Sequence, residues 1–104
     1  MKSDREKNLS DIVVSLCADY ERRKSAIRER SVEGRVLAEY IYINSKLLWA
    51  AREICGMEFA ERFILDIGGR IGYAKTEMEG YSECTYKKHK SDIKRNMMKR
   101  LNLI

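Results

Sequence analysis

The sequence predicts an all-α fold, built as one small helical domain. Apolar residues recur at helical spacing in several separate segments, which is the pattern of amphipathic helices. Proline is absent from the sequence, so no residue of that type interrupts a long helix. The 104 residues, 44% of them apolar and 36% charged, suffice for one modest core with a solvated surface. We therefore expect a single domain over residues 1–104, with a helical scaffold over 9–55 and a second portion over 57–104.

The first predicted helix runs from Leu9 to about Arg30, with Ser10 or Asp11 as its N-cap. From Glu21 onward it mixes positive and negative side chains at i,i+4 spacing, which is typical of a solvated helix surface. Its predicted inner face consists of Leu9, Ile12, Val13, Leu16, Cys17, Tyr20 and Ile27.

A second, antiparallel helix is predicted over roughly Glu33 to Ile54, ending at Gly56. Aromatic residues at helical spacing usually belong to a core, so we assign Tyr40, Tyr42 and Trp49 to packing. The apolar stripe is wide for a domain of this size, which is consistent with a homodimer. It comprises Val36, Leu37, Tyr40, Ile41, Ile43, Leu47, Leu48, Ala51 and Ile54.

Two shorter elements follow. A helix is predicted over about Glu58 to Ile67, and Gly68-Gly69 then predicts a bend. The segment Tyr73–Glu79 is long enough for two helical turns, and Gly80 suits the positive φ of a tight turn.

The last helix is predicted to start at Ser82, a strong N-cap, with the carboxylate of Glu83 in its first turn. A short helix, a glycine turn and a Ser-capped helix follow one another in the order of a helix-turn-helix. Winding the last helix at 100° per residue separates its two faces. Tyr86, His89, Ile93, Met97 and Leu101 point toward the body, and Cys84, Lys87, Lys88, Ser91, Lys94 and Arg95 point broadly away.

The residues from Ser82 to Ile104 carry the whole net charge of the chain, because they contain seven Lys or Arg and two acidic residues, whereas the first 81 residues are neutral. A concentrated basic helix predicts binding to a polyanion, with double-stranded DNA the first candidate. Lysines near the start of the helix can contact the edges of DNA bases, and the Lys and Arg residues further along can contact phosphates. The candidate DNA-binding residues are Ser82, Glu83, Cys84, Thr85, Lys87, Lys88, Ser91, Lys94 and Arg95.

Several segments resemble the small phage transcriptional regulators of the RinA/ArpU type, which are similar to region 4 of sigma-70 factors. The resemblance covers about half the chain and is carried by Gly72-Tyr73, Tyr81–Lys90, Leu101–Leu103 and Asp19–Lys24 with Ile27. It implies a phage transcription regulator with a helix-turn-helix, duplex DNA as ligand and RNA polymerase as a further partner. Position by position, it makes Ser82 the cap, Glu83, Cys84, Lys87 and Lys88 groove-facing, and Tyr86 a packing residue.

The sequence departs from the sigma-type pattern in the helix before the turn. Thr76 and Glu79 stand at about the positions where an alanine and a leucine usually lock the two helices together, which leaves Met78 as the main apolar anchor.

Catalysis and cofactor binding are not expected. The one histidine, His89, is flanked by lysines, and its spacing from Cys84 does not match a zinc motif. Cys17, Cys55 and Cys84 are expected to be reduced thiols. The charged N-terminus and the short apolar runs predict a cytoplasmic protein with no membrane contact.

Two alternatives to a DNA-binding regulator stay open. One is a small helical protein-interaction module, for example a phage inhibitor of a host protein, whose basic helix docks on an acidic surface. The other is RNA binding, although the predicted outer face lacks the stacking aromatics of single-stranded RNA readers.

Overall fold

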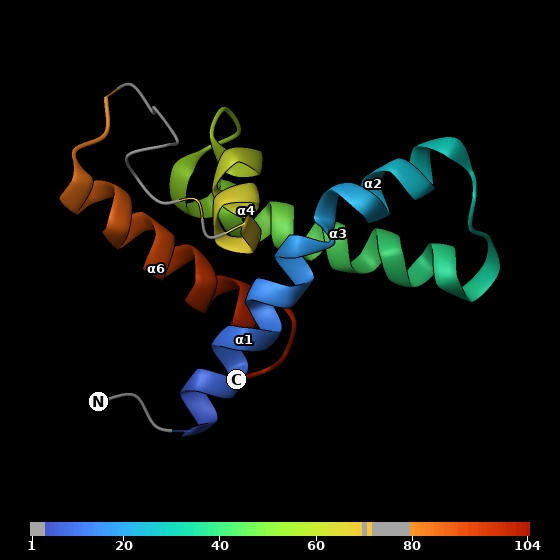
Figure 1. Cartoon of the computed structure of the whole chain (residues 1–104), viewed down its shortest axis with the longest axis horizontal. Coiled ribbons are helices and arrows are strands. Elements are labelled where there is room, and N and C mark those ends of the chain that lie inside the picture. Colours follow the sequence, from blue (N-terminus) through green and yellow to red (C-terminus); the bar gives the residue numbers. More distant parts are fainter. Residues whose placement is uncertain (1–3, 70, 72–79) are drawn as a thin grey trace.

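The computed structural model describes residues 4–69, 71 and 80–104, and these form helices with no strand among them (Figure 1). The helices are α1 (Asp4–Ala18), α2 (Tyr20–Glu29), α3 (Gly34–Cys55), α4 (Ala60–Gly69) and α6 (Glu83–Arg100). The predicted all-α class is therefore confirmed. The predicted element Tyr73–Glu79 lies outside the described residues.

The first predicted helix is in fact two helices, α1 and α2, which are separated at Asp19 (φ −94°, ψ 4°). Buried polar side chains fill the break. Arg23 Nε donates to Asn44 Oδ1 at 2.6 Å, and the same guanidinium donates to the Leu16 carbonyl. Asn44 Nδ2 donates to the Tyr20 carbonyl at 3.1 Å. Apolar periodicity continues through this segment, so it could not reveal a break that contacts from another helix stabilise.

The predicted start of the first helix, at Leu9, was also wrong, because it lies too far toward the C-terminus. α1 begins at Asp4, so Ser10 and Asp11 lie inside it and neither is its N-cap. Asp4 and Glu6 stand in its first turn, where the helix dipole favours negative charge. This extension adds the residues before Leu9 to the ordered surface.

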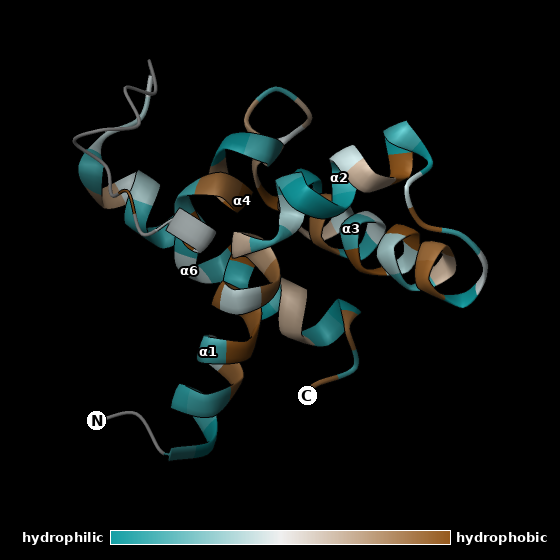
Figure 2. Cartoon of the chain, turned by 45° about the vertical axis from the view of Figure 1, so that its right-hand side comes forward, coloured by the Kyte–Doolittle hydropathy of each residue, from teal (hydrophilic) through white to brown (hydrophobic). Residues whose placement is uncertain are grey.

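The core lies where α1, α3, α4 and α6 meet, and the brown apolar residues of these helices converge there (Figure 2). Both Gly68 and Gly69 belong to α4, so the chain does not bend at them as predicted. Gly68 instead allows α4 to approach the α1 backbone closely. The buried apolar residues are Val13, Cys17, Tyr20, Leu47, Ala50, Ala51, Ala60, Phe63, Ile64, Ile67, Tyr86, Ile93 and Met97.

α2 and the first half of α3 form a helical hairpin that projects from the side opposite α6 (Figure 1). Arg30, with a left-handed φ of 55°, ends α2 at the tip, and α3 returns antiparallel to it. The predicted antiparallel pairing is therefore confirmed for α2 and α3, whereas α1 turns away from α3. Gly56 ends α3 as predicted, with a φ of 82° and its N–H donating to the Arg52 carbonyl at 2.9 Å.

The apolar stripe of α3 is only partly covered. Asn44, Leu47, Ala50 and Ala51 are buried, but Val36 and Ile41 are exposed because the first half of α3 extends past the core. The assignment of the aromatics to packing was wrong for two of them. Tyr40 is half-buried, whereas Tyr42 and Trp49 lie on the outer face of the helix, 47% and 51% exposed.

Candidate nucleic-acid interface

Helix α6 begins with a capping interaction at the predicted residue. The Thr85 backbone N–H donates to Ser82 Oγ at 3.2 Å, and the Ser82 hydroxyl donates to Thr85 Oγ1 at 2.9 Å. Ser82 is thus the N-cap, and both hydroxyls take part in the cap. In the first turn, Glu83 pairs with Lys87 at 3.1 Å, and both side chains remain largely exposed.

The inner face of α6 matches its prediction. Tyr86, Ile93 and Met97 are fully buried, and His89 and Leu101 are half-buried. Burial of three large side chains at this spacing fixes the rotation of the helix about its own axis. The opposite side must therefore face away from the core.

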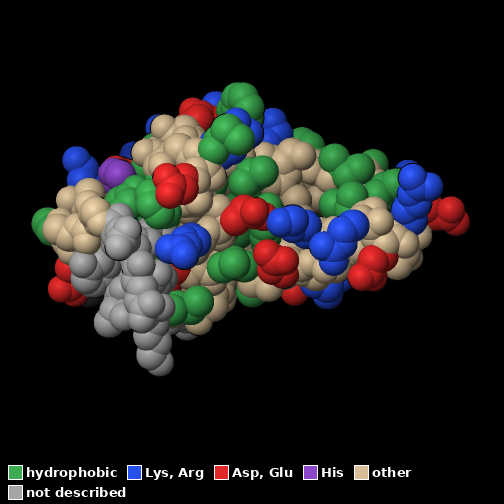
Figure 3. Space-filling model, turned by 90° about the horizontal axis from the view of Figure 1, so that it is seen from above, with side chains coloured by type: hydrophobic (Ala, Val, Ile, Leu, Met, Phe, Trp, Pro, Cys, Tyr) green, Lys and Arg blue, Asp and Glu red, His purple; other side chains and the backbone are tan. Residues whose placement is uncertain are grey.

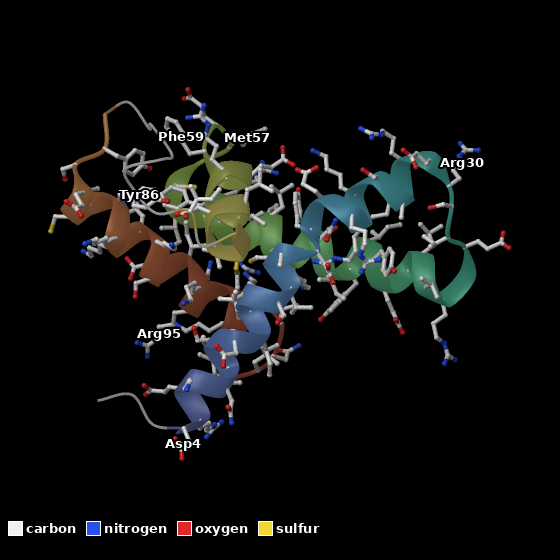
Figure 4. All side chains as sticks on the ribbon, viewed as in Figure 1. Asp4, Arg30, Met57, Phe59, Tyr86 and Arg95 are labelled. Atoms are coloured by element: carbon white, nitrogen blue, oxygen red, sulfur yellow. The ribbon has the colours of Figure 1, made fainter. Side chains whose placement is uncertain are left out.

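A cluster of rings anchors the first half of α6 to α4. Phe63 stacks on Tyr86, with centroids 5.0 Å apart and ring planes 22° apart. Tyr81 contacts Phe59, Phe63 and Tyr86 edge-on, and its hydroxyl lies 3.2 Å from His89 Nδ1. Figure 4 shows Phe59 and Tyr86 on facing sides of this cluster. His89 is therefore a packing residue, as the sequence suggested.

Two basic residues of α6 are paired with the body of the protein, Arg100 with Glu53 of α3 and Lys90 with Asp66 of α4. Lys90 Nζ lies 3.3 Å from Oδ2 of Asp66, whose side chain is fully buried in α4. A buried carboxylate requires such a partner. The ion pair ties α6 to α4, so Lys90 has less freedom to bind a ligand than its neighbours.

The predicted outer face of α6 is exposed along its length. Lys87, Lys88 and Arg95 are exposed, with Cys84 and Ser91 among them, while Lys94 is half-buried. In Figure 4, Arg95 points outward from α6 on the side of the N-terminal half of α1. The structure thus brings the predicted bases together on one surface.

A groove of about 730 Å³ lies between this surface and α1. The basic residues Arg5, Lys87, Lys90, Lys94 and Arg95 line it, with Glu6 as the acidic residue. The remaining lining residues are Leu9, Ser10, Ser91, Met98 and Ile104.

The contribution of α1 to this groove was missed by the sequence prediction. Arg5 and Glu6 precede the apolar residue from which the first helix was thought to start. The acidic first turn at Asp4 and Glu6 is the signal that could have placed the start of α1 correctly.

Charge elsewhere on the molecule is mixed. On the face shown in Figure 3, basic and acidic side chains alternate along the length of the molecule. In α2, Lys24 Nζ lies 2.6 Å from Glu61 Oε2, and Arg22 lies 3.3 Å from Asp19. These pairs neutralise charge locally, and in this respect the face seen in Figure 3 differs from the basic groove.

The described residues contain no group of three or more His, Cys, Asp or Glu side chains that could hold a metal ion. Cys17 is buried, and burial raises the pKa of its thiol to about 12. Cys84 is exposed on the outer face of α6, and Cys55 is half-buried.

No helix in the described ranges is both long and apolar enough to span a bilayer.

Comparison with protein-family models, curated proteins and solved structures found no match to this chain.

Proposed function

We propose that the chain binds double-stranded DNA through the outer face of α6 and the groove between α6 and α1. One observation carries this proposal: five Lys and Arg residues from two helices line a single groove that borders the exposed start of α6. Lys and Arg side chains neutralise phosphates and release their counterions, which supplies most of the affinity for a nucleic acid.

The start of α6 suits contacts with base edges. An α-helix is about 10–12 Å wide with its side chains, and the major groove of B-DNA is about 12 Å wide. Lys87 and Lys88 lie one turn from the N-cap and are exposed, so they can donate to guanine O6 and N7. The backbone N–H groups of Glu83 and Cys84, which the Ser82 cap does not use, add donors for a phosphate.

The groove suits the sugar–phosphate backbone beside that contact. Arg95 and Lys94 line it from α6, and Arg5 lines it from α1. Basic residues on both walls can neutralise consecutive phosphates of one DNA strand. Such contacts fix the position of the protein along the duplex without reading its sequence. Lys90 contributes less, because it is paired with Asp66.

The proposal extends to transcription. The resemblance to phage regulators similar to sigma-70 region 4 supports a cytoplasmic regulator whose DNA-bound form contacts RNA polymerase. In vitro transcription from a promoter containing the preferred site, with and without the protein, tests this role. A change in transcript yield that Lys88→Glu removes supports the proposal, and an unchanged yield at saturating protein contradicts it.

Fluorescence anisotropy with a labelled duplex of random sequence tests DNA binding itself. We expect binding at 50 mM salt that weakens steeply as salt rises. Lys88→Glu and Arg95→Glu should each weaken binding at least about tenfold, since each reverses a charge at the interface. Arg28→Glu on α2 is the matched control, because it makes the same charge change on the hairpin that projects away from α6 (Figure 1).

A second candidate function is docking of an acidic amphipathic protein segment in the same groove. It is favoured by three apolar residues, Leu9, Met98 and Ile104, which line the groove among the bases. Duplex DNA offers little apolar surface there. An acidic amphipathic helical peptide that binds, and loses affinity on Met98→Gln, together with no duplex binding at 50 mM salt, would select this function.

A further inference from the structure

The outer face of α3 carries large side chains at coiled-coil spacing. Arg35, Tyr42 and Trp49 stand seven residues apart, so they follow one line along the helix. Tyr42 and Trp49 are about half exposed, and the neighbouring Ile41 is 45% exposed. Such aromatics on a helix surface are characteristic of protein interfaces.

Cations lie over both rings. Lys46 Nζ is 5.4 Å from the Tyr42 ring centroid, and the guanidinium carbons of Arg52 and Arg100 are 5.7 Å and 5.9 Å from that of Trp49. These contacts are within cation–π range and hold the rings in place on the surface. The face is therefore formed before any partner binds.

The charges on this face are complementary to themselves. Glu39 and Lys46 are also seven residues apart, about 10 Å along the axis, which is too far for them to pair within one helix. Glu39 forms no ion pair with any residue in the described part of the chain. The exposed Glu39 carboxylate is therefore available to a positive charge on a partner. The Lys46 ammonium is half-buried over the Tyr42 ring and still has N–H donors for a partner's carboxylate.

We propose that α3 pairs antiparallel with α3 of a second copy of the chain, about a two-fold axis near Tyr42. In that register Glu39 of each copy faces Lys46 of the other, which gives two equivalent ion pairs. Tyr42 faces Tyr42, and Arg35 faces Trp49, which adds a cation–π contact on each side. Residues of this kind flank the seam of antiparallel helix pairs.

We propose a second copy of the chain as the partner because the charges on this face of α3 are more complementary to the same face than to other surfaces. The face carries charges of both signs, with Glu39 between Arg35 and Lys46 in the sequence, so a partner of uniform charge would meet a like charge at one of these positions. An isologous interface requires each group to meet its partner across the two-fold axis, and Glu39 and Lys46 satisfy this requirement. The pairing does not depend on DNA binding.

Sedimentation velocity of the full chain across a concentration series, without DNA, tests the pairing by charge reversal. We expect a dimer for the unaltered chain, and a dissociation constant at least about tenfold weaker for Glu39→Lys and for Lys46→Glu, since each places like charges across the axis. The double variant Glu39→Lys/Lys46→Glu restores the opposite charges and should dimerise like the unaltered chain. Lys88→Glu is the control and should leave the dimer unchanged.

Three results would overturn the pairing: a monomer at concentrations of about 200 μM, single variants that dimerise normally, or a double variant that stays monomeric while circular dichroism shows it folded. Tyr42→Ala provides an independent check, because it removes the contact at the axis without changing charge and should also weaken the dimer. A dimer that forms normally in Tyr42→Ala would contradict the proposed axis.

Discussion

Gly68 of α4 lies directly against the backbone of Ala18 at the end of α1. A Cβ atom added at Gly68 would lie 2.5 Å from the Ala18 nitrogen, closer than real Cβ contacts allow. The position therefore needs glycine for close helix packing rather than for a special φ. The contact is made at the break between α1 and α2, which sets the direction in which α1 runs toward the groove.

Gly68→Ala is expected to destabilise the fold by about 3 kcal/mol, since the obstacle is backbone that can move only if α1 and α4 separate. Urea unfolding followed by circular dichroism measures the change. Gly69→Ala is the matched control: its Cβ would meet only the Ile71 side chain, at 3.3 Å, so it should be neutral or slightly stabilising. Equal effects of the two variants would contradict the close approach of α4 to α1.

Arg23→Ala is expected to destabilise the protein by about 3 kcal/mol, because it leaves Asn44 Oδ1 and the Leu16 carbonyl without their donor in a buried site. The neighbouring Arg22→Ala removes an exposed pair with Asp19 and should change stability by less than about 1 kcal/mol. Thermal and urea unfolding provide the comparison. A small loss for Arg23→Ala would mean that the break between α1 and α2 does not depend on this network.

Ser82→Ala is expected to destabilise by about 1 kcal/mol, because it removes the acceptor for the Thr85 N–H. Ser82→Asp retains an acceptor and should stay close to the unaltered stability. Urea midpoints of the two variants measure the difference. Loss of the same size in both would show that the hydroxyl serves something other than the cap.

The buried thiol of Cys17 predicts a loss of stability at high pH. Burial raises its pKa from about 9.0 to about 12, so the unfolded chain ionises first. The stabilisation is complete below pH 9 and declines between pH 9 and 12, by at most about 1.4 kcal/mol per pH unit. Cys17→Ala lacks this proton, so its unfolding free energy should fall less steeply over that range. Parallel slopes for the two proteins would contradict the burial of an uncharged thiol.

Local signals in the sequence were sufficient for the last helix. Ser82 has the side chain that caps a helix, and the spacing of Tyr86, Ile93 and Met97 defines one face. Both features depend on residues within a few turns of one another, so the cap and the buried side of α6 could be predicted without knowledge of the rest of the fold.

Features decided by distant contacts could not be predicted in this way. The break at Asp19 is stabilised by Asn44 of α3, and the role of Gly68 depends on where α1 passes. Trp49 has the spacing of a packing residue, yet about half of its surface is exposed, and the side chains over its ring are the guanidinium groups of Arg52 and Arg100. The groove could not be predicted, because Arg5 lines it only when α1 extends N-terminal to Leu9, as the structure shows.

Arg5 tests most directly whether basic residues of α6 and α1 form one DNA-binding surface. Arg5 lies outside the basic C-terminal segment, and only the folded structure places it in the groove. Duplex affinity of Arg5→Glu should be measured by anisotropy at 50 mM salt, beside Arg95→Glu and the control Arg28→Glu. We expect Arg5→Glu and Arg95→Glu each to weaken duplex affinity at least about tenfold while Arg28→Glu binds normally. Normal binding by Arg5→Glu, or no duplex binding by the unaltered chain, would contradict a single DNA-binding surface on α6 and α1.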